Sequence, residues 1–296
     1  ARAIRKLEPK IAVTLVEPNP VFTACPFSNG VIAGLRNLLQ QQFGYDGVRR
    51  DGVVVAQTAA TAVDGAARSV TLADGNTLSY DRLVMAPGID INWAALPGYT
   101  EQAAEIMPHA WKAGPQTLLL RRQLEAMPDG GVVAMTIPPN PYRCPPGPYE
   151  RASLIAYYLK TRKPRSKLLL IDAKDTFSKQ PLFLEGWKLL YGDLVEWLPF
   201  AKVGNLVRVD AAAKTVYTDF AEQKADVVNV IAPQRAAAIA VDAGLTSGGD
   251  WCTVNQSTFE STVTPGIHII GDAAIAGSMP KSGFSAGSHG KALAFK

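Results

Sequence analysis

Short runs of β-branched and aliphatic residues recur along the chain, and each run ends in small or polar residues. The clearest runs lie in residues 11–17, 81–88, 132–137, 167–172 and 264–272. Near-continuous apolar runs of this length are typical of strands that are buried on both faces of a parallel sheet. The pattern therefore predicts an α/β protein with two Rossmann-like domains, in which ligands bind where the strands end.

The stretch 264–272 carries the clearest ligand signal. Its apolar run ends in Gly271 and Asp272, so a glycine lets the backbone approach a ligand and a carboxylate stands at the strand's carboxyl end. A small-residue loop containing Lys281 and Ser282 leads from there into a predicted helix start, which suits anionic or carbonyl oxygens. Flavoproteins with two dinucleotide domains hold the ribityl and pyrophosphate groups of FAD in this way. A buried strand that merely happens to end in Gly-Asp is the alternative.

Two upstream strand ends support an FAD domain. The first ends in Glu17, where the second strand of a dinucleotide fold carries the acid that binds the adenosine ribose. The second ends in Ala86 and Gly88, which are small enough for a pyrophosphate to pass. An exposed acid at a strand end is the alternative for Glu17. Because the glycine fingerprint is expected about 20 residues before that acid, it is expected to lie outside this chain.

A second unit has the layout of a nicotinamide-nucleotide domain. Residues 132–137, 150–160 and 167–172 form a strand, helix and strand pattern. The loop before the helix is rich in proline, however, and presents Cys144 shortly before Glu150. A phosphate cradle needs backbone N–H groups, which proline lacks. We therefore expect a domain that has the shape for NAD but a degenerate nucleotide site.

The domain limits follow from this pattern. Residues 1–98 are expected to form the first part of the FAD domain and residues 99–232 the second Rossmann-like domain. Residues 233–296 are expected to return to the FAD domain.

Composition narrows the possible partners. Hydrophobic residues make up 47% of the 296 residues and charged residues only 19%, with a formal net charge of +4. A small surplus without Lys/Arg runs argues against nucleic acid, and no apolar stretch is long enough to predict a transmembrane segment. The three cysteines are scattered without Cys-x-x-Cys spacing, so we expect neither a metal site nor haem attachment in this chain. Cys252 lies in an apolar run and is interpreted as a buried structural thiol.

Three motifs together carry a family resemblance. They are Thr-Ala-Cys25-Pro-Phe-Ser-Asn, Arg143-Cys-Pro-Pro-Gly-Pro-Tyr-Glu-Arg-Ala, and Ile-Gly-Asp272 followed by Met279-Pro-Lys-Ser-Gly-Phe-Ser-Ala. Over essentially the whole chain they resemble the flavoprotein subunit of flavocytochrome c sulfide dehydrogenase. This family belongs to the disulfide-reductase-like flavoproteins and is related to the sulfide:quinone oxidoreductases.

The resemblance implies specific roles. The cysteine matching Cys25 carries FAD through a thioether, and the one matching Cys144 is half of a redox disulfide beside the flavin, near the acid matching Glu150. The other half comes from a carboxy-terminal domain that we expect to lie outside this chain. Sulfide is the implied substrate, a c-type cytochrome subunit bearing haem is the implied partner, and the periplasm is the implied location. A sulfide:quinone oxidoreductase and a non-catalytic flavin-fold fragment remain alternatives.

Overall fold

The computed structural model describes residues 1–295, which form two compact units. The first unit comprises residues 1–22, 43–90 and 234–296, and the second comprises residues 23–42 and 91–233. The sequence pattern predicts domain boundaries at 98/99 and 232/233. The structure differs from this division mainly in residues 23–42, which fold with the second unit.

The second unit is built on a four-stranded sheet with the order β12-β11-β10-β16, in which all strands are parallel. Apart from its first residue, each of the two central strands is buried throughout, which explains why their sequences are apolar runs. The strands are β10 (Val132–Ile137), β11 (Lys167–Asp172), β12 (Val195–Leu198) and β16 (Val227–Val230).

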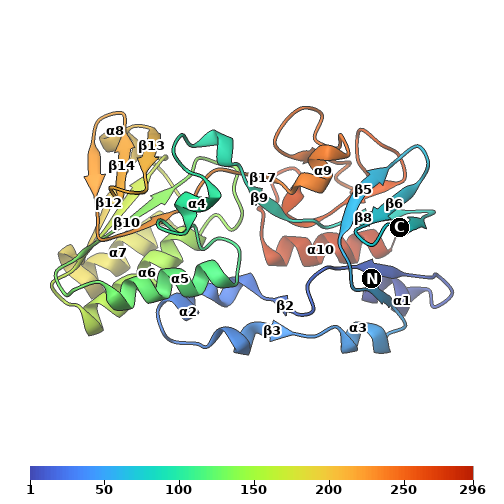
Figure 1. The fold of residues 1–296 in the computed structure, drawn as a ribbon, viewed down its shortest axis with the longest axis horizontal. Coiled ribbons are helices and arrows are strands. Elements are labelled where there is room, and N and C mark those ends of the chain that lie inside the picture. Colours follow the sequence, from blue (N-terminus) through green and yellow to red (C-terminus); the bar gives the residue numbers. More distant parts are fainter. Residues whose placement is uncertain (296) are drawn as a thin grey trace. The chain divides into compact units, whose positions relative to one another are not determined.

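Helices cover this sheet, and a smaller antiparallel sheet completes the unit (Figure 1). Helix α6 packs against β11 and α7, and α2 packs against both α5 and α6. The helices are α2 (Ser28–Ile32), α4 (Glu101–Ala104), α5 (Pro115–Ala126), α6 (Gly147–Arg162), α7 (Gln180–Tyr191) and α8 (Phe200–Val203). The antiparallel strands are β13 (Leu206–Asp210), β14 (Thr215–Thr218) and β15 (Glu222–Lys224).

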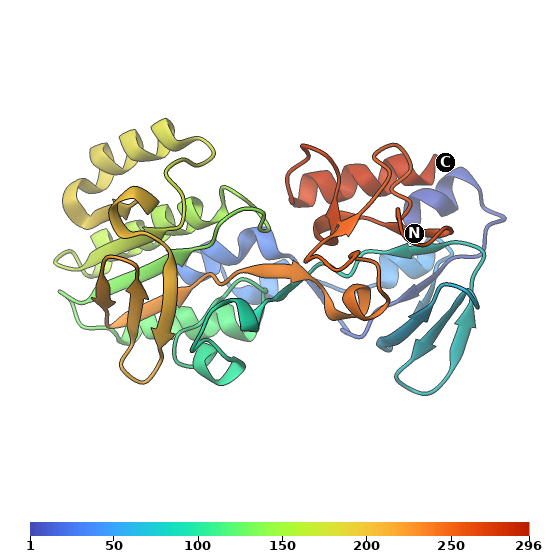
Figure 2. The same cartoon turned by 90° about the horizontal axis from the view of Figure 1, so that it is seen from above.

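The first unit contains short parallel strand pairs and an antiparallel meander. The parallel pairs are β1 (Thr14–Val16) with β4 (Val54–Ala56), β8 (Leu83–Met85) with β19 (Ile267–Ile269), and β18 (Cys252–Thr253) with β20 (Ala274–Ile275). The meander consists of β5 (Ala60–Asp64), β6 (Ser69–Leu72) and β7 (Thr77–Ser79), and Figure 2 shows it in teal. The helices are α1 (Arg2–Leu7), α3 (Asp46–Arg50), α9 (Ala238–Asp242) and α10 (Gly283–Ala294).

Four further short strands lie where the chain passes between the units. They are β2 (Phe22–Thr23) paired with β3 (Gln42–Phe43), and β9 (Ile89–Ile91) paired with β17 (Gln234–Ala236). The predicted fold class, α/β with parallel sheets, is confirmed by the strand pairing in both units. The predicted strands at 132–137 and 167–172 have the same limits in the structure as in the sequence pattern.

Candidate active site

The predicted FAD-contacting residues of the first unit follow the carboxyl ends of its parallel strands. Strands β8 and β19 pair in register, Ile269 opposite Met85, so the Ala86–Gly88 turn lies beside Gly271 and Asp272. Gly88 and Gly271 have φ values of 73° and 72°, a left-handed backbone that favours glycine. A Cβ atom at Gly88 would meet nothing within 4 Å, so the backbone there borders open space.

Glu17 follows β1 as predicted. Its Oε1 accepts hydrogen bonds from the backbone N (2.9 Å) and side-chain Nδ2 (2.7 Å) of Asn19. The carboxylate is therefore oriented by its own turn. Strand β1 pairs with β4, and no hydrogen bond joins Glu17 to the turns after β8 and β19 among residues 1–295.

Lys281 braces the turn that follows β19. Its Nζ donates to the carbonyls of Asp272 (2.8 Å) and Ala274 (2.9 Å) and lies 3.7 Å from the centre of the Trp251 ring. The side chain is buried, and burial lowers the pKa of the Lys281 amine to about 8. Lys281 was predicted to bind the cofactor, and its observed contacts are with the backbone that presents Asp272.

The first turn of helix α10 has backbone N–H groups that could bind a ligand. Ser282 is its N-cap, and its Oγ accepts from the N–H of Ser285 at 3.1 Å. The N–H groups of Gly283 and Phe284 donate to no acceptor within residues 1–295. On the same helix, His289 accepts from Gly271 N through Nδ1 (3.2 Å), while its buried Nε2 has no partner in the described chain.

These features fit FAD. The open space beside Gly88, the free N–H groups at the start of α10 and the unpaired His289 Nε2 suit a ligand rich in hydroxyl and phosphate oxygens. The first unit therefore has donors and space of the kind that a flavin dinucleotide requires.

The second unit brings Cys25 and Cys144 to the same tryptophan. Cys25 opens a short 3₁₀ turn before α2, and its Sγ lies 3.8 Å from the carbonyl oxygen of Trp111. A Cβ atom built on Gly147 would lie 2.9 Å from Trp111 Cη2 and 3.0 Å from Cys144 Sγ. The glycine therefore allows the Cys144 sulfur and the indole to pack together at the start of α6.

Cys144 sits in a constrained loop. Its φ is 59°, in the left-handed region that non-glycine residues rarely adopt. Burial raises the pKa of its thiol, as do Glu150 and Cys25, while the N–H of Gly147 and the charge of Arg143 oppose this. The isolated thiol is thus protonated at neutral pH.

Glu150 lies in the first turns of α6. Partial desolvation raises the pKa of its carboxyl, and hydrogen bonding to Asn29 and the charge of Arg151 pull in the other direction. Its side chain remains exposed to solvent. A carboxyl group with a raised pKa can exchange protons with water at pH values nearer neutrality.

Several residues around the cysteines were not predicted from the sequence. Trp111 is buried against both cysteines, and the buried Arg151 lies over its ring. Arg151 in turn donates hydrogen bonds to Asn29, His109 and Asn229. They come from distant parts of the chain, so no local motif joins them. The feature that could have indicated a buried charge is the position of Arg151, directly after Glu150 and among buried residues of the same helix.

Helix α6 begins without free donors. The N–H of Gly147 donates to Cys144 O (2.7 Å), and the N–H groups of Tyr149 (3.2 Å) and Glu150 (3.1 Å) donate to Pro146 O. Pro148 has no N–H. The first turn therefore offers no backbone donor to a pyrophosphate, in contrast to the start of α10.

The acid at the end of β11 is also occupied. In a dinucleotide fold this position binds a ribose. Asp172 is fully buried and accepts from Tyr149 Oη (2.6 Å), Lys174 Nζ (2.6 Å) and Trp197 Nε1 (3.0 Å). Phe177 stacks on Tyr149 with ring centroids 3.6 Å apart. Internal donors from Tyr149, Lys174 and Trp197 thus occupy the carboxylate that would otherwise accept from a nucleotide ribose.

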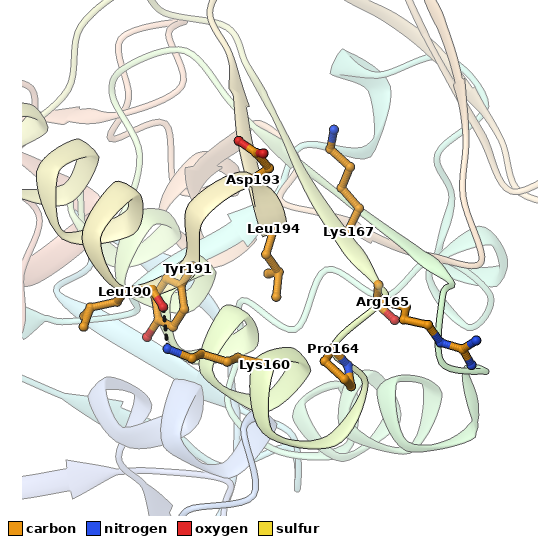
Figure 3. Close-up of a pocket in the computed structure, with 9 residues that line it drawn as sticks. Lys160, Pro164, Arg165, Lys167, Leu190, Tyr191, Asp193 and Leu194 are labelled. Carbon is orange, nitrogen blue, oxygen red and sulfur yellow. Dashed lines mark hydrogen bonds between the residues drawn. The ribbon is translucent and has the colours of Figure 1, made fainter.

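A pocket in the second unit lies near the opposite, amino-terminal end of β11 (Figure 3). It has a volume of about 390 Å³ and is lined by basic side chains, including Lys160, Arg165 and Lys167. Lys160 Nζ donates to Leu190 O at 2.6 Å, as the dashed line in Figure 3 shows. None of the predicted site residues lines it.

Within residues 1–295, His, Cys, Asp and Glu side chains form no group of three that could hold a metal ion. No helix in that range has the length and apolar character needed to cross a membrane.

Comparison with protein families gives a match within the second unit. Residues 117–232 match the family model of the "Sulfide dehydrogenase [flavocytochrome c] flavoprotein chain, central". The flavoprotein chain of sulfide dehydrogenase [flavocytochrome c] from Chlorobaculum thiosulfatiphilum is 61% identical over 31 residues. That match covers 10% of this chain and 65% of the relative.

Solved structures show the same fold at low sequence identity. The sulfide:quinone oxidoreductase of Aquifex aeolicus aligns with a TM-score of 0.83 and 18% identity, over 99% of this chain and 72% of that chain. The NAD-dependent persulfide reductase of A. fulgidus aligns with a TM-score of 0.71 and 17% identity, over 99% and 56%. The water-forming NADH oxidase of Lactobacillus brevis aligns with a TM-score of 0.75 and 16% identity, over 100% and 65%.

Proposed function

Since residues 117–232 match the family model of the flavocytochrome c sulfide dehydrogenase flavoprotein chain, we propose that this chain carries FAD in a sulfide dehydrogenase. The enzyme oxidises sulfide through Cys144 and FAD and passes electrons singly to a c-type cytochrome subunit that bears the haem, in the periplasm. The observation that carries the proposal is the meeting of Cys25 and Cys144 at Trp111, beside a helix start that has no free N–H for a nucleotide.

The residues of the first unit have distinct roles in holding FAD. Glu17 would accept from the adenosine ribose, and Ala86 and Gly88 would give room to the pyrophosphate. Asp272, braced by Lys281, would accept from a ribityl hydroxyl. The start of α10 at Ser282 would donate N–H groups to the remaining oxygens. When bound, FAD supplies an acceptor for two electrons that can be released one at a time.

In the second unit, Cys25 would hold the flavin through a thioether. This attachment would keep the flavin beside Cys144, because both sulfurs border Trp111. A covalent link to a half-buried residue at the start of a packed turn costs little additional ordering at the moment of reaction.

Cys144 would take part in the oxidation of sulfide as one half of a redox disulfide. In the oxidised enzyme it forms a disulfide with a second cysteine, and hydrosulfide attacks that second sulfur. A new S–S bond forms to the incoming sulfur, the old one breaks, and Cys144 leaves as a thiolate without needing a proton. Glu150 exchanges the remaining protons with water. The proline-stiffened loop fixes the Cys144 sulfur, so little entropy is lost in presenting it.

The test compares two cysteine variants of the full-length flavoprotein. Cys144→Ser should abolish the sulfide-driven loss of the flavin absorption band in stopped flow, while FAD stays attached. Cys252→Ser is the matched control, because that thiol is fully buried in the first unit and burial raises its pKa to about 11. Retention of sulfide-driven reduction in Cys144→Ser, with its loss in Cys252→Ser, would reverse the assignment.

Attachment through Cys25 is tested separately. In the wild-type protein the flavin should stay with the polypeptide after acid precipitation, and in Cys25→Ser it should appear in the supernatant. Absorbance of both fractions and the mass of the intact chain measure this. Flavin that extracts freely from the wild-type protein would refute the thioether.

A further inference from the structure

A buried positive charge, the guanidinium of Arg151, lies close to the two sulfurs and has no role in the sulfur chemistry proposed above. Arg151 is only 2% exposed. Its Nε donates to Asn29 Oδ1 (3.0 Å), its Nη1 to Asn229 Oδ1 (2.8 Å), and its Nη2 to Ala110 O (2.6 Å). The guanidinium carbon lies 4.8 Å from the Trp111 ring centre. All of these partners are neutral.

The orientation of these acceptors is fixed by further hydrogen bonds. Asn229 Nδ2 donates to Pro108 O (2.7 Å) and His109 O (3.0 Å), so its Oδ1 must face the guanidinium. Within residues 1–295, no carboxylate lies within ion-pair distance of Arg151. Buried charges are normally paired, so an arginine held only by neutral acceptors leaves a positive potential around it.

The neighbouring histidine does not share this charge. His109 Nδ1 accepts from the N–H of Trp111 at 2.9 Å, and burial together with Arg151 lowers the pKa of the imidazole to about 3. It is therefore neutral at physiological pH. Arg143, which donates to Trp111 O and is half-buried, and the exposed Lys112 add further positive charge on the same side.

Two sulfurs and one carboxyl lie close to this charge. The Trp111 ring that the guanidinium covers also lies against Gly147 beside Cys144 Sγ, and the Trp111 carbonyl oxygen is 3.8 Å from Cys25 Sγ. Cys25, Glu150 and Cys144 each favour the charged form of Arg151, so all three lie within its electrostatic reach. We propose that Arg151 holds a fixed positive charge at the sulfur pair and thereby draws the anionic form of a small sulfur nucleophile to Cys144. The ligand is hydrosulfide rather than neutral hydrogen sulfide, and Arg151 is a positioning residue for it.

The physical reason is that the anion is the nucleophile. An ionised sulfur attacks a disulfide, whereas the protonated form does not. A positive potential at the wall of a site raises the local concentration of anions. Because the guanidinium is held from four directions, it cannot swing to pair with an incoming ion, and it acts through its charge. The inference rests on the proposed function, although its test does not.

The test measures the charge at Cys144 with no sulfide or flavin present. The chain of residues 1–296 carrying Cys25→Ser is alkylated with iodoacetate, an anion, and with iodoacetamide, which is neutral. Both reagents need the same thiolate, so the ratio of their rates reports the local potential independently of the thiol's pKa. Arg151→Met should lower the ratio about three- to tenfold, the effect expected of one unit charge nearby in a partly hydrated site.

Three variants make the outcome decisive. Arg151→Lys keeps the charge and should keep the ratio within about twofold. Asn29→Asp places a carboxylate at the oxygen that accepts from Arg151 Nε, so it should lower the ratio as Arg151→Met does, with almost no change in shape. Arg165→Met, a 78% exposed side chain lining the pocket of Figure 3, should change nothing.

The outcomes separate cleanly. If Arg151→Met fails to fold, as judged by circular dichroism, Asn29→Asp against the Cys25→Ser parent decides the question. A ratio unchanged in the folded charge-removing variants, or lowered equally by Arg165→Met, would overturn the proposal. Such a result would leave the sulfide test of Cys144→Ser unaffected, so the two failures can be told apart.

Discussion

Burial at single residues controls which ionisable groups can change charge in this protein. His109 is the strongest case, because the pKa of its imidazole falls to about 3 from an ordinary value of 6.5. Burial is the largest cause, followed by the charge of Arg151. Between pH 6.5 and pH 3 the imidazole of His109 is therefore protonated in the unfolded chain and neutral in the folded chain.

His109→Asn should accordingly reduce the acid sensitivity of the fold. Stability is lost as the pH falls through this window, by at most about 1.4 kcal/mol per pH unit from this one residue. Asparagine can keep an acceptor near Trp111 N but does not titrate. Urea unfolding at pH 7 and pH 4.5 should show a smaller difference in the variant than in the parent. Equal differences would mean that other groups dominate the acid response.

The second prediction at the residue scale concerns Lys281. Lys281→Met removes the two hydrogen bonds that hold the Asp272–Ala274 turn. In a Cys25→Ser background, where FAD binds without a covalent link, the dissociation constant should rise at least tenfold, since the loss of even one bond to a charged donor costs on the order of 1.5 kcal/mol or more. Fluorescence titration measures it. Lys291→Met, in the exposed last turn of α10, is the matched control, and an equal loss there would argue against the bracing role.

At the scale of elements, the first turns of α10 and α6 differ in whether their backbone N–H groups are free to bind a ligand. The start of α10 leaves the N–H groups of Gly283 and Phe284 open, whereas α6 has its first-turn donors bonded internally or absent. Asp172, at the end of β11, is likewise tied to Tyr149 and Trp197. Sequence composition predicted this difference through proline, and the hydrogen bonds give its physical basis.

Neither NADH nor NADPH should therefore reduce the flavin at a useful rate. A helix start without donors cannot bind a pyrophosphate through its backbone. Mixing the flavoprotein with either nucleotide in stopped flow should leave the flavin band unchanged over times in which sulfide bleaches it. Rapid bleaching by NADH would show that the nucleotide site is intact and would contradict the proposed loss.

At the scale of the whole molecule, the electron acceptor distinguishes the proposed function from its nearest alternative. The full-length flavoprotein, given sulfide, should reduce a c-type cytochrome and should not reduce a water-soluble quinone analogue. The reason is that the family model which residues 117–232 match is described as a flavoprotein chain of flavocytochrome c. Absorbance at the cytochrome and quinone bands measures both reactions. Preferential quinone reduction would favour a sulfide:quinone oxidoreductase.

The sequence by itself determined the parallel strands and the places where they end. Strands β10 and β11 have the limits that the apolar runs predict, because strands buried on both faces must be apolar throughout. The same reasoning located the turns at Gly88 and Gly271, both left-handed in the structure. Burial of Cys252, predicted from its apolar neighbours, is confirmed.

Only the tertiary structure decided which residues surround the sulfurs. Residues 23–42 fold with the second unit, and this places Cys25 and Asn29 near α6. Arg151 is held by residues 29, 109, 110 and 229, separations that no local pattern encodes. A buried strand can be predicted from the sequence because burial requires its consecutive residues to be apolar. The partners of a buried charge come from distant parts of the chain and meet only when it has folded, so the sequence carries no local pattern for them.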